Sequence, residues 1–226
     1  MEENLKEPKM QSKSDIARNE ILKKIAEAKK VRKDFSVGAD LQSAPDWDTN
    51  IYKEIDCPLE ECFAQELAAV NGNAILCRSE NEVFEKIKSL LVEKNITRLF
   101  CRTKEIAEKL SANHIPFSAA EAGFLSMEAG ITFCEALVAR TGSVMVSAAH
   151  EAGRQMNVFP PIHIVVAKKS QIVPYLSDAL MFMKEKYGDN LPSAITNITG
   201  PSRTADIEKT LILGAHGPKE IYVLIY

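Results

Sequence analysis

The sequence predicts an α/β fold, with a mixed, largely parallel sheet flanked by helices and a helical extension at the N-terminus. The first observation behind this is that short aliphatic runs alternate with longer segments whose apolar residues recur at helical spacing. The second is that 46% of the 226 residues are hydrophobic and 26% are charged, a balance that supports a large buried core. We expect a tail, helical arm and linker over residues 1–55 and one α/β domain over residues 56–226.

The N-terminal extension is expected to hold one amphipathic helix. Residues 1–13 are polar and read as a tail, and Ser14 with Asp15 is typical of a helix start. Apolar residues then fall on one face until the basic run at residues 29–33. Two interpretations stay open, since this helix could pack on its own domain or reach a partner subunit. Residues 35–55 form an expected linker around Trp47.

The first half of the domain alternates between helices and strands. Pro58 is placed to begin a helix whose apolar residues recur until Gly72, and Ser79 with Glu82 forms a capping box before the next helix. Short connections of this kind favour parallel strands. The other expected elements are strands at residues 74–77, 97–102 and 115–118 and a helix at residues 104–112.

The second half holds eight of the ten glycines, which favours tight turns and a site. Residues 131–139 and 143–148 are expected to be strands joined by a hairpin in which Gly142 takes positive φ. Further strands are expected at residues 162–167, 194–198 and 220–225. Helices are expected from Pro174 to Gly188 and over residues 204–213.

Composition limits the function. A formal net charge of −3 and an isoelectric point near 5.9 argue against general nucleic-acid binding. No apolar run reaches the roughly 20 residues of a membrane span, so we expect a cytoplasmic protein. The cysteines are odd in number, scattered and without a Cys-x-x-Cys pair, so we expect reduced, apolar side chains rather than disulfides or a metal site. They are Cys57, Cys62, Cys77, Cys101 and Cys134.

The strongest local candidate for binding is the segment from Thr199 to Thr204, which is predicted to pass from a strand through a turn into a helix start. Unpaired N–H groups at a helix start attract anions, and the Arg203 side chain suits a carboxylate or phosphate. In the alternative interpretation, Ser202 or Thr204 only caps the helix, and Arg203 forms an ion pair with a nearby carboxylate.

Histidines and carboxylates supply the candidates for catalysis. His216 lies in a glycine-flanked turn, where a rigid scaffold can position a functional side chain. His150 is a candidate for a loop over the site, whereas His163 lies in an apolar strand and is expected to be a satisfied core residue. Glu135 and Glu208 could serve as base or nucleophile, or form ordinary ion pairs.

Five motifs follow one another in the second half of the chain: Gly130-Ile131-Thr132, Ala139-x-Thr141-Gly142-Ser143, Pro160-Pro161-x-His163, Ile198 to Glu208 and Gly214-x-His216-Gly217-Pro218. Together they resemble the LUD domain of the lactate-utilisation protein C family over roughly residues 71–226. The resemblance implies a fold related to the sugar-phosphate isomerase and CoA-transferase group. It also implies a subunit of a three-protein system that oxidises L-lactate to pyruvate, with iron–sulfur clusters in partner subunits and no cofactor in this chain.

One position departs from the family pattern. The family usually carries an acidic residue in the Ala-x-Thr-Gly turn, where this sequence has Arg140. If that acidic residue served catalysis in the family, its replacement bears on activity. If it met a partner, the charge that faces the partner has changed.

Two functions from different classes follow. The first is an accessory subunit of the lactate-oxidising system that binds a small anion or a partner and has no complete redox centre. The second is a stand-alone enzyme for a phosphorylated or CoA-linked small molecule, with Glu135, Glu208 and His216 as catalytic residues. The expected anion-binding residues are Thr141, Gly142, Thr199, Gly200, Ser202, Arg203, Thr204 and Gly217.

Overall fold

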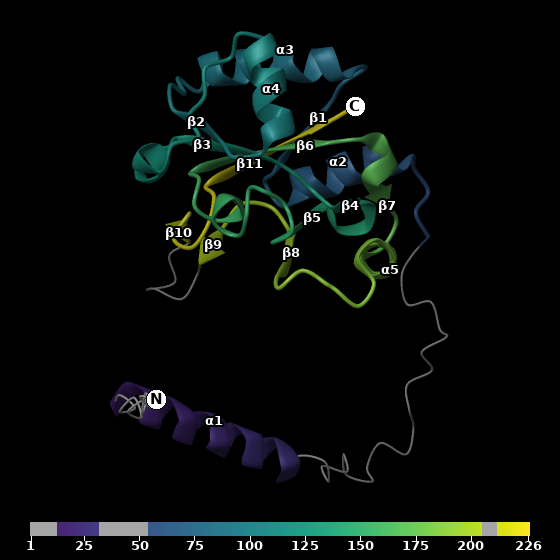
Figure 1. Ribbon diagram of the computed structural model, residues 1–226. Helices are drawn as coiled ribbons and strands as arrows, with labels where there is room; N and C mark the ends of the chain where they lie inside the picture. Colours follow the sequence, from purple (N-terminus) through teal and green to yellow (C-terminus); the bar gives the residue numbers. More distant parts are fainter. Residues whose placement is uncertain (1–12, 32–53, 205–211) are drawn as a thin grey trace, which may run out of the picture. The chain divides into compact units, whose positions relative to one another are not determined.

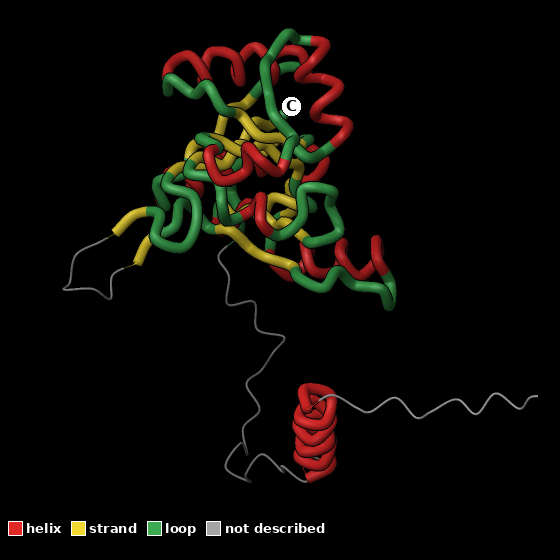
Figure 2. The backbone as a smooth tube through the Cα atoms, turned by 60° about the vertical axis from the view of Figure 1, so that its left-hand side comes forward, coloured by secondary structure: helices red, strands yellow, loops and turns green. Residues whose placement is uncertain are grey.

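The computed structural model describes residues 13–31, 54–204 and 212–226, and the chain divides into two units, Met1–Lys53 and Glu54–Tyr226 (Figures 1 and 2). In the first unit, the expected helix is present as α1 (Lys13–Val31). Its apolar side chains Ile21, Leu22 and Ile25 are exposed. Trp47 and the expected linker lie outside the described residues. Within the described ranges, no helix has the length and apolarity needed to cross a membrane.

The second unit is built on a five-stranded sheet in which every pair of neighbouring strands is parallel. The central strand β6 pairs on both sides, so that His163 lies opposite Ile221 on one neighbour and Gly130 on the other. Strands buried on both faces read as nearly continuous apolar runs, as the sequence predicted for β6 and β11. In spatial order the strands are β1 (Asn73–Leu76), β11 (Glu220–Ile225), β6 (Ile162–Ala167), β3 (Ala129–Phe133) and β2 (Leu99–Cys101).

Helices cover both faces of this sheet. Figure 1 shows α3 (Glu80–Glu93) and α4 (Lys104–Ala112) on one face and α2 (Leu59–Ala69) on the other. Side chains of β6 alternate between the two apolar clusters, because successive residues of a strand point to opposite faces. Phe63 and Leu67 of α2 are fully buried in the second cluster. The expected helices at α2, α3 and α4 are therefore confirmed, each packing an apolar stripe on the sheet.

A separate four-stranded sheet corrects the expectation of one mixed sheet. Its strands β4 and β7 are parallel, and its other neighbouring pairs are antiparallel. The predicted strand at residues 131–139 is wrong as a single element, since the chain leaves the parallel sheet at Cys134 and Glu135 and enters the second sheet. Helix α5 (Leu176–Tyr187) packs on this sheet through Ala179 and Met183. The spatial order is β7 (Ile172–Val173), β4 (Ala136–Val138), β5 (Ser143–Ser147) and β8 (Ile195–Ile198).

The turn between β4 and β5 is the predicted hairpin. Gly142 has φ +58°, and a Cβ atom there would lie 2.1 Å from the backbone nitrogen of Leu67. Only glycine satisfies both the dihedral angle and this contact with α2. Short 3₁₀ turns at Glu121–Ser126, Ala139–Thr141, Gln155–Asn157 and Lys169–Gln171 complete the connections.

Two predicted elements of the α/β domain are wrong. The expected helix at residues 204–213 is not continuous, because β9 (Arg203–Thr204) pairs antiparallel with β10 (Ile212–Leu213). A ten-residue helix holds its ends about 15 Å apart, whereas the pairing places Thr204 opposite Ile212. Residues 205–211, and Glu208 with them, lie outside the described residues. The expected strand at residues 115–118 is reduced to one bridge between Phe100 and Ser118.

The cysteines are also only partly as expected. Cys57 and Cys62 form a disulfide across the start of α2, with their Cα atoms 5.9 Å apart. The extended residue Pro58 begins the helix between them, so Cys57 lies close to the first turn. The other three, Cys77, Cys101 and Cys134, are free and buried, as predicted for small apolar side chains.

Candidate functional site

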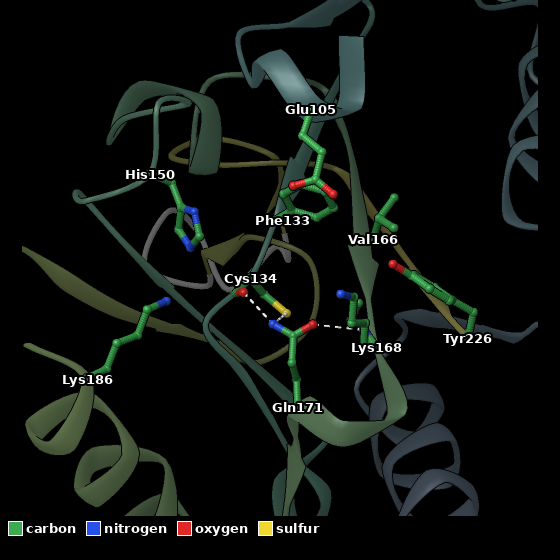
Figure 3. A pocket seen from close by; sticks show the side chains of 10 residues that line it. Glu105, Phe133, Cys134, His150, Val166, Lys168, Gln171, Lys186 and Tyr226 are labelled. Carbon is green, nitrogen blue, oxygen red and sulfur yellow. Dashed lines mark hydrogen bonds between the residues drawn. The ribbon is translucent and has the colours of Figure 1, made fainter. Parts of the chain in front are cut away.

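A cleft opens at the carboxyl ends of the parallel strands, where ligands commonly bind in open α/β sheets. It contains a cavity of about 190 Å³ whose walls include Phe133 at the end of β3, Lys168 just after β6 and Tyr226 just after β11 (Figure 3). An adjoining cavity of about 540 Å³ shares Glu105, Phe133 and His150 with the first. The two cavities therefore adjoin each other, and they are together called the cleft.

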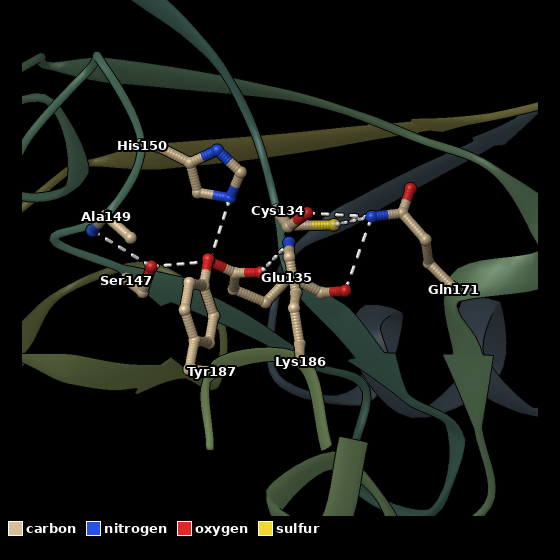
Figure 4. Close-up of polar contacts among 8 residues, drawn as sticks. All are labelled: Cys134, Glu135, Ser147, Ala149, His150, Gln171, Lys186 and Tyr187. Carbon is tan, nitrogen blue, oxygen red and sulfur yellow. Dashed lines mark hydrogen bonds and ion pairs between the residues drawn. The ribbon is translucent and has the colours of Figure 1, made fainter. Parts of the chain in front are cut away.

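Glu135 is the buried charge beside this cleft, in the connection where the chain passes from β3 to β4. Its side chain is fully buried. One carboxylate oxygen, Oε1, accepts hydrogen bonds from Ser147 Oγ at 2.5 Å and Tyr187 Oη at 2.8 Å. The other, Oε2, accepts from Lys186 Nζ at 2.7 Å (Figure 4). Strand β5 and the last turn of α5 thus supply partners that a buried carboxylate requires.

The loop after β5 adds His150, whose Nε2 lies 3.1 Å from Glu135 Oε1. This distance allows an ion pair when the imidazole is protonated, although the ring nitrogen is not directed for a hydrogen bond. Ser147 Oγ also accepts from the backbone N–H of Ala149 at 3.1 Å, which fixes the start of the loop. His150 lies in a loop, as predicted, but this loop borders Glu135 and the cleft rather than the predicted anion site at the glycine turns.

These contacts decide the chemistry of Glu135. Burial alone raises the pKa of a carboxyl, but the contacts from His150, Lys186, Ser147 and Tyr187 outweigh it and hold the pKa of Glu135 well below its usual range. Burial lowers the pKa of Lys186, yet its bond to Glu135 leaves that pKa raised. A carboxylate this firmly ionised is a weak base. Glu135 is therefore suited to positioning Lys186, Tyr187 and His150 rather than to abstracting a proton.

Gln171 joins the Glu135 connection to the segment after β6. Its Nε2 donates to the carbonyl of Cys134 at 2.7 Å and to that of Glu135 at 3.3 Å, while its Oε1 accepts from the N–H of Lys168 at 2.8 Å. The neighbouring Cys134 thiol is not a nucleophile, because burial raises its pKa to about 12.

The predicted turns at Thr141, Thr199 and Ser202 lie close to one another but away from this cleft. Ser143 Oγ lies 2.7 Å from both Thr141 Oγ1 and Thr199 Oγ1, so the three hydroxyls form a chain. Ser202 donates its N–H to the carbonyl of Pro218 at 2.8 Å. At Gly217, an added Cβ would lie 3.0 Å from Ser202 Cβ. The turn that contains His216 and Gly217 therefore packs against the turn that contains Ser202.

Arg203 contacts protein backbone rather than a helix start. Its Nη2 donates to the carbonyl of Val70 at 3.0 Å, at the C-terminal end of α2, where cationic side chains are favourable. Gly200, with φ +76°, packs on the same carbonyl, which lies 2.5 Å from the position of an added Cβ. Anion binding by this group of turns stays a prediction. It rested on a helix that starts at Thr204, but Thr204 lies in strand β9 instead.

The remaining candidates are dispersed. His216 is exposed in the turn before β11, and the contacts of Glu135 among the described residues do not include it. Arg140 Nη1 lies 3.8 Å from Glu66 Oε1 on α2. His163 is buried in the core, as predicted, but it is only partly satisfied: its Nε2 lies 2.8 Å from Thr132 Oγ1, whereas its buried Nδ1 has no hydrogen-bond partner among the described residues. Burial lowers the pKa of His163 to about 4.

Metal ligands do not gather in the parts of the chain that the structure describes. There, no group of three or more histidine, cysteine, aspartate or glutamate residues is arranged to hold a metal ion. The expectation that this chain has no cofactor of its own stays a prediction.

Sequence reasoning missed most of the polar shell of Glu135. The one available signal was Glu135 itself, a lone carboxylate within the apolar run from Phe133 to Val138, which must find partners if it is buried. Lys186 and Tyr187 looked like an ordinary helix end before Gly188. The missed residues of this shell are Ser147, Gln171, Lys186 and Tyr187, and Lys168 was missed in the cleft wall.

A family model described as the LUD domain matches residues 59–226. The chain belongs to the LUD domain family. The matched range contains the residues that line the cleft, Glu135 with its polar partners, and the glycine turns. It confirms the resemblance that the sequence motifs suggested.

Three relatives of this LUD domain protein share the name Lactate utilization protein C. A protein named Lactate utilization protein C from Bacillus licheniformis is 39% identical over 99 residues, which cover 42% of this chain and 41% of that protein. Its namesakes from Bacillus velezensis and Bacillus subtilis are 41% and 39% identical over the same coverage. The matched part is thus less than half the length of these relatives.

A solved structure supports the fold. The crystal structure of a DUF162 family protein from Deinococcus radiodurans is similar with a TM-score of 0.55 and 17% sequence identity, covering 74% of this chain and 95% of that one. At this identity the similarity is evidence for the α/β fold alone.

Proposed function

We propose that this chain is an accessory subunit of a lactate-utilisation system that oxidises L-lactate to pyruvate, and that its cleft binds a small carboxylate. Membership of the LUD domain family, with relatives named Lactate utilization protein C, is the observation that carries this proposal. The chain brings no complete redox centre, and iron–sulfur clusters in partner subunits accept the electrons.

The chemistry of the cleft supports a small carboxylate as its ligand. Lys168 lines the smaller cavity. Among the described residues its ammonium forms no close ion pair, but it acts electrostatically on Glu80 and helps to lower the pKa of that carboxyl. Lys186, by contrast, already neutralises Glu135. A volume of about 190 Å³ is below the range of drug-sized ligand pockets, so a molecule of a few heavy atoms fits it best. Lys168 and His150 both line this cavity, and we infer that they contact the carboxylate of the ligand.

The assembly is tested by co-expression with cluster-bearing subunits of such a system. We expect the tagged chain to co-purify with at least one of them and the isolated chain to be colourless and inactive on lactate. Failure to co-purify with any of these subunits, from cells in which all are soluble, contradicts the accessory role.

The ligand is tested by titrating L-lactate and pyruvate into the purified chain by calorimetry. Lys168→Met should weaken binding about tenfold, because it removes a charge-assisted contact to the carboxylate. Lys169→Met is the matched control, since the Lys169 ammonium instead lies 3.9 Å from Glu60 and outside the cleft wall. Equal effects of the two substitutions contradict a carboxylate site at Lys168.

The second candidate is a stand-alone enzyme for a phosphorylated or CoA-linked small molecule. The observation that favours it is the continuation of the cleft into the larger cavity, which offers room for an extended ligand. The assignment of Glu135 and His216 as a catalytic pair is not supported by their separate surroundings. Turnover of such a substrate by the purified chain alone, lost in His150→Gln, would favour this function over the accessory role.

A further inference from the structure

We propose that the N-terminus of α4 is a second anion subsite, one that takes a phosphate group and is held closed by the carboxylate of Glu151. The inference does not rest on the lactate assignment. It starts from the larger of the two cavities, which Thr103, Lys104 and Glu151 line together.

Helix α4 spans nine residues, and the side chain of its N-cap residue Thr103 makes no capping hydrogen bond to the first turn. Unpaired N–H groups and the helix dipole make such an end attractive to anions. Glu151, from the loop after β5, already uses this property: one of its carboxylate oxygens accepts the N–H of Lys104 at 2.7 Å. This carboxylate stands in for an external oxyanion.

Thr103 provides the second, independent observation. The residue is only 7% exposed, and its hydroxyl oxygen Oγ1 has no hydrogen-bond partner among the described residues. A threonine at this N-cap position usually accepts an N–H from the first turn, and here it does not. Burying an unpaired hydroxyl is unfavourable, so this group is better explained as a donor to a ligand oxygen.

The number of donors favours phosphate over carboxylate. The N–H groups of Lys104, Glu105 and Ile106 and the hydroxyl of Thr103 make four donors, which suit three phosphate oxygens better than two carboxylate oxygens. Two acidic side chains, Glu105 and Glu108, also line the cavity. The carboxylate of Glu105 lies 3.1 Å from Lys109 Nζ, which offsets its repulsion of an anion.

The loop after β5 links this subsite to the Glu135 cleft. His150 lies at Glu135 on one side, and the next residue, Glu151, lies at α4 on the other. A phosphate that displaces Glu151 from α4 therefore releases one end of the loop that holds His150 beside Glu135. The ligand class that fits both ends is a small molecule with a phosphate group at α4 and a second polar group near Lys168.

The test is a titration of the full chain with inorganic phosphate. Calorimetry measures the affinity, and the amide NMR signals of residues 104–106 report where phosphate binds. Glu151→Ala should bind phosphate about tenfold tighter, because it removes the competing carboxylate. Thr103→Val should bind it several-fold more weakly, and Thr103→Ser should restore binding. Acetate should bind more weakly than phosphate to every variant. Glu93→Ala, which removes an exposed carboxylate of α3 outside the cleft, is the control for net charge.

Glu151→Ala is expected to tighten phosphate binding and Thr103→Val to weaken it. These opposite effects separate a ligand site from a structural role. If Glu151→Ala binds phosphate no tighter than the control, or if the amides of residues 104–106 do not shift, the proposal is overturned. It is also overturned if Thr103→Val lowers the melting temperature but leaves phosphate affinity unchanged. Glu151→Ala keeps the test decisive should the valine variant not fold, because its expected tighter binding does not depend on Thr103.

Discussion

The buried charge of Glu135 allows a quantitative test, the substitution Glu135→Gln. In the native protein, the carboxylate accepts bonds from Lys186, Tyr187 and Ser147 at 2.5–2.8 Å with no exposed side-chain surface. Removing one partner of a buried ion pair costs about 3–5 kcal/mol. Because the Lys186 side chain is 41% exposed and can return to water, we expect a loss near the lower end, about 3 kcal/mol.

Urea unfolding at pH 7 measures this loss, and Glu220→Gln is the matched control. Glu220 receives a hydrogen bond from Lys94 at the same 2.7 Å, but its side chain is 38% exposed. Exposed ion pairs contribute about 0–1 kcal/mol, so the control should lose no more than that. A loss below about 1 kcal/mol in Glu135→Gln, or equal losses in the two variants, refutes the reasoning from burial.

The pH dependence gives the same test a sign. The folded-state pKa of Glu135 is lowered, so its stabilisation is present above the unfolded pKa of about 4.3 and is lost as pH falls towards the folded pKa. The difference between the native protein and Glu135→Gln should therefore be largest at neutral pH and shrink below about pH 4. A difference that is constant or grows on acidification contradicts the assignment of Glu135 as the ionised group.

Two further predictions concern α2. Gly142→Ala should destabilise the domain by about 3 kcal/mol or more in urea unfolding, since the Cβ meets the backbone of Leu67; a loss within 0.5 kcal/mol contradicts the packing. Reduction of the disulfide between Cys57 and Cys62 should cost about 2 kcal/mol by loop-closure entropy, measured as a lower melting temperature in the native protein under reductant. The double variant Cys57→Ser with Cys62→Ser should then show no response to reductant.

Local sequence patterns predicted the bounds of an element correctly where its apolar residues recur at the spacing of the face that it buries. The buried strands at residues 162–167 and 220–225 and the helix at residues 104–112 have the predicted bounds, because their apolar periods match the faces that they bury. The family assignment likewise followed from motifs, since glycine turns at fixed spacing can be recognised in the sequence without knowledge of the tertiary contacts. The helix expected at residues 204–213 failed because antiparallel pairing between its two ends outweighed a local helical pattern.

By itself, the sequence determined the α/β class, most element bounds, the LUD domain family and the candidacy of Glu135. Only the tertiary structure decided that the chain leaves one sheet for another at Glu135, and that Ser147, Lys186 and Tyr187 surround this carboxylate. These partners lie 12, 51 and 52 residues further along the chain. The physical reason is that a buried charge needs partners, but no local pattern states which distant element will supply them.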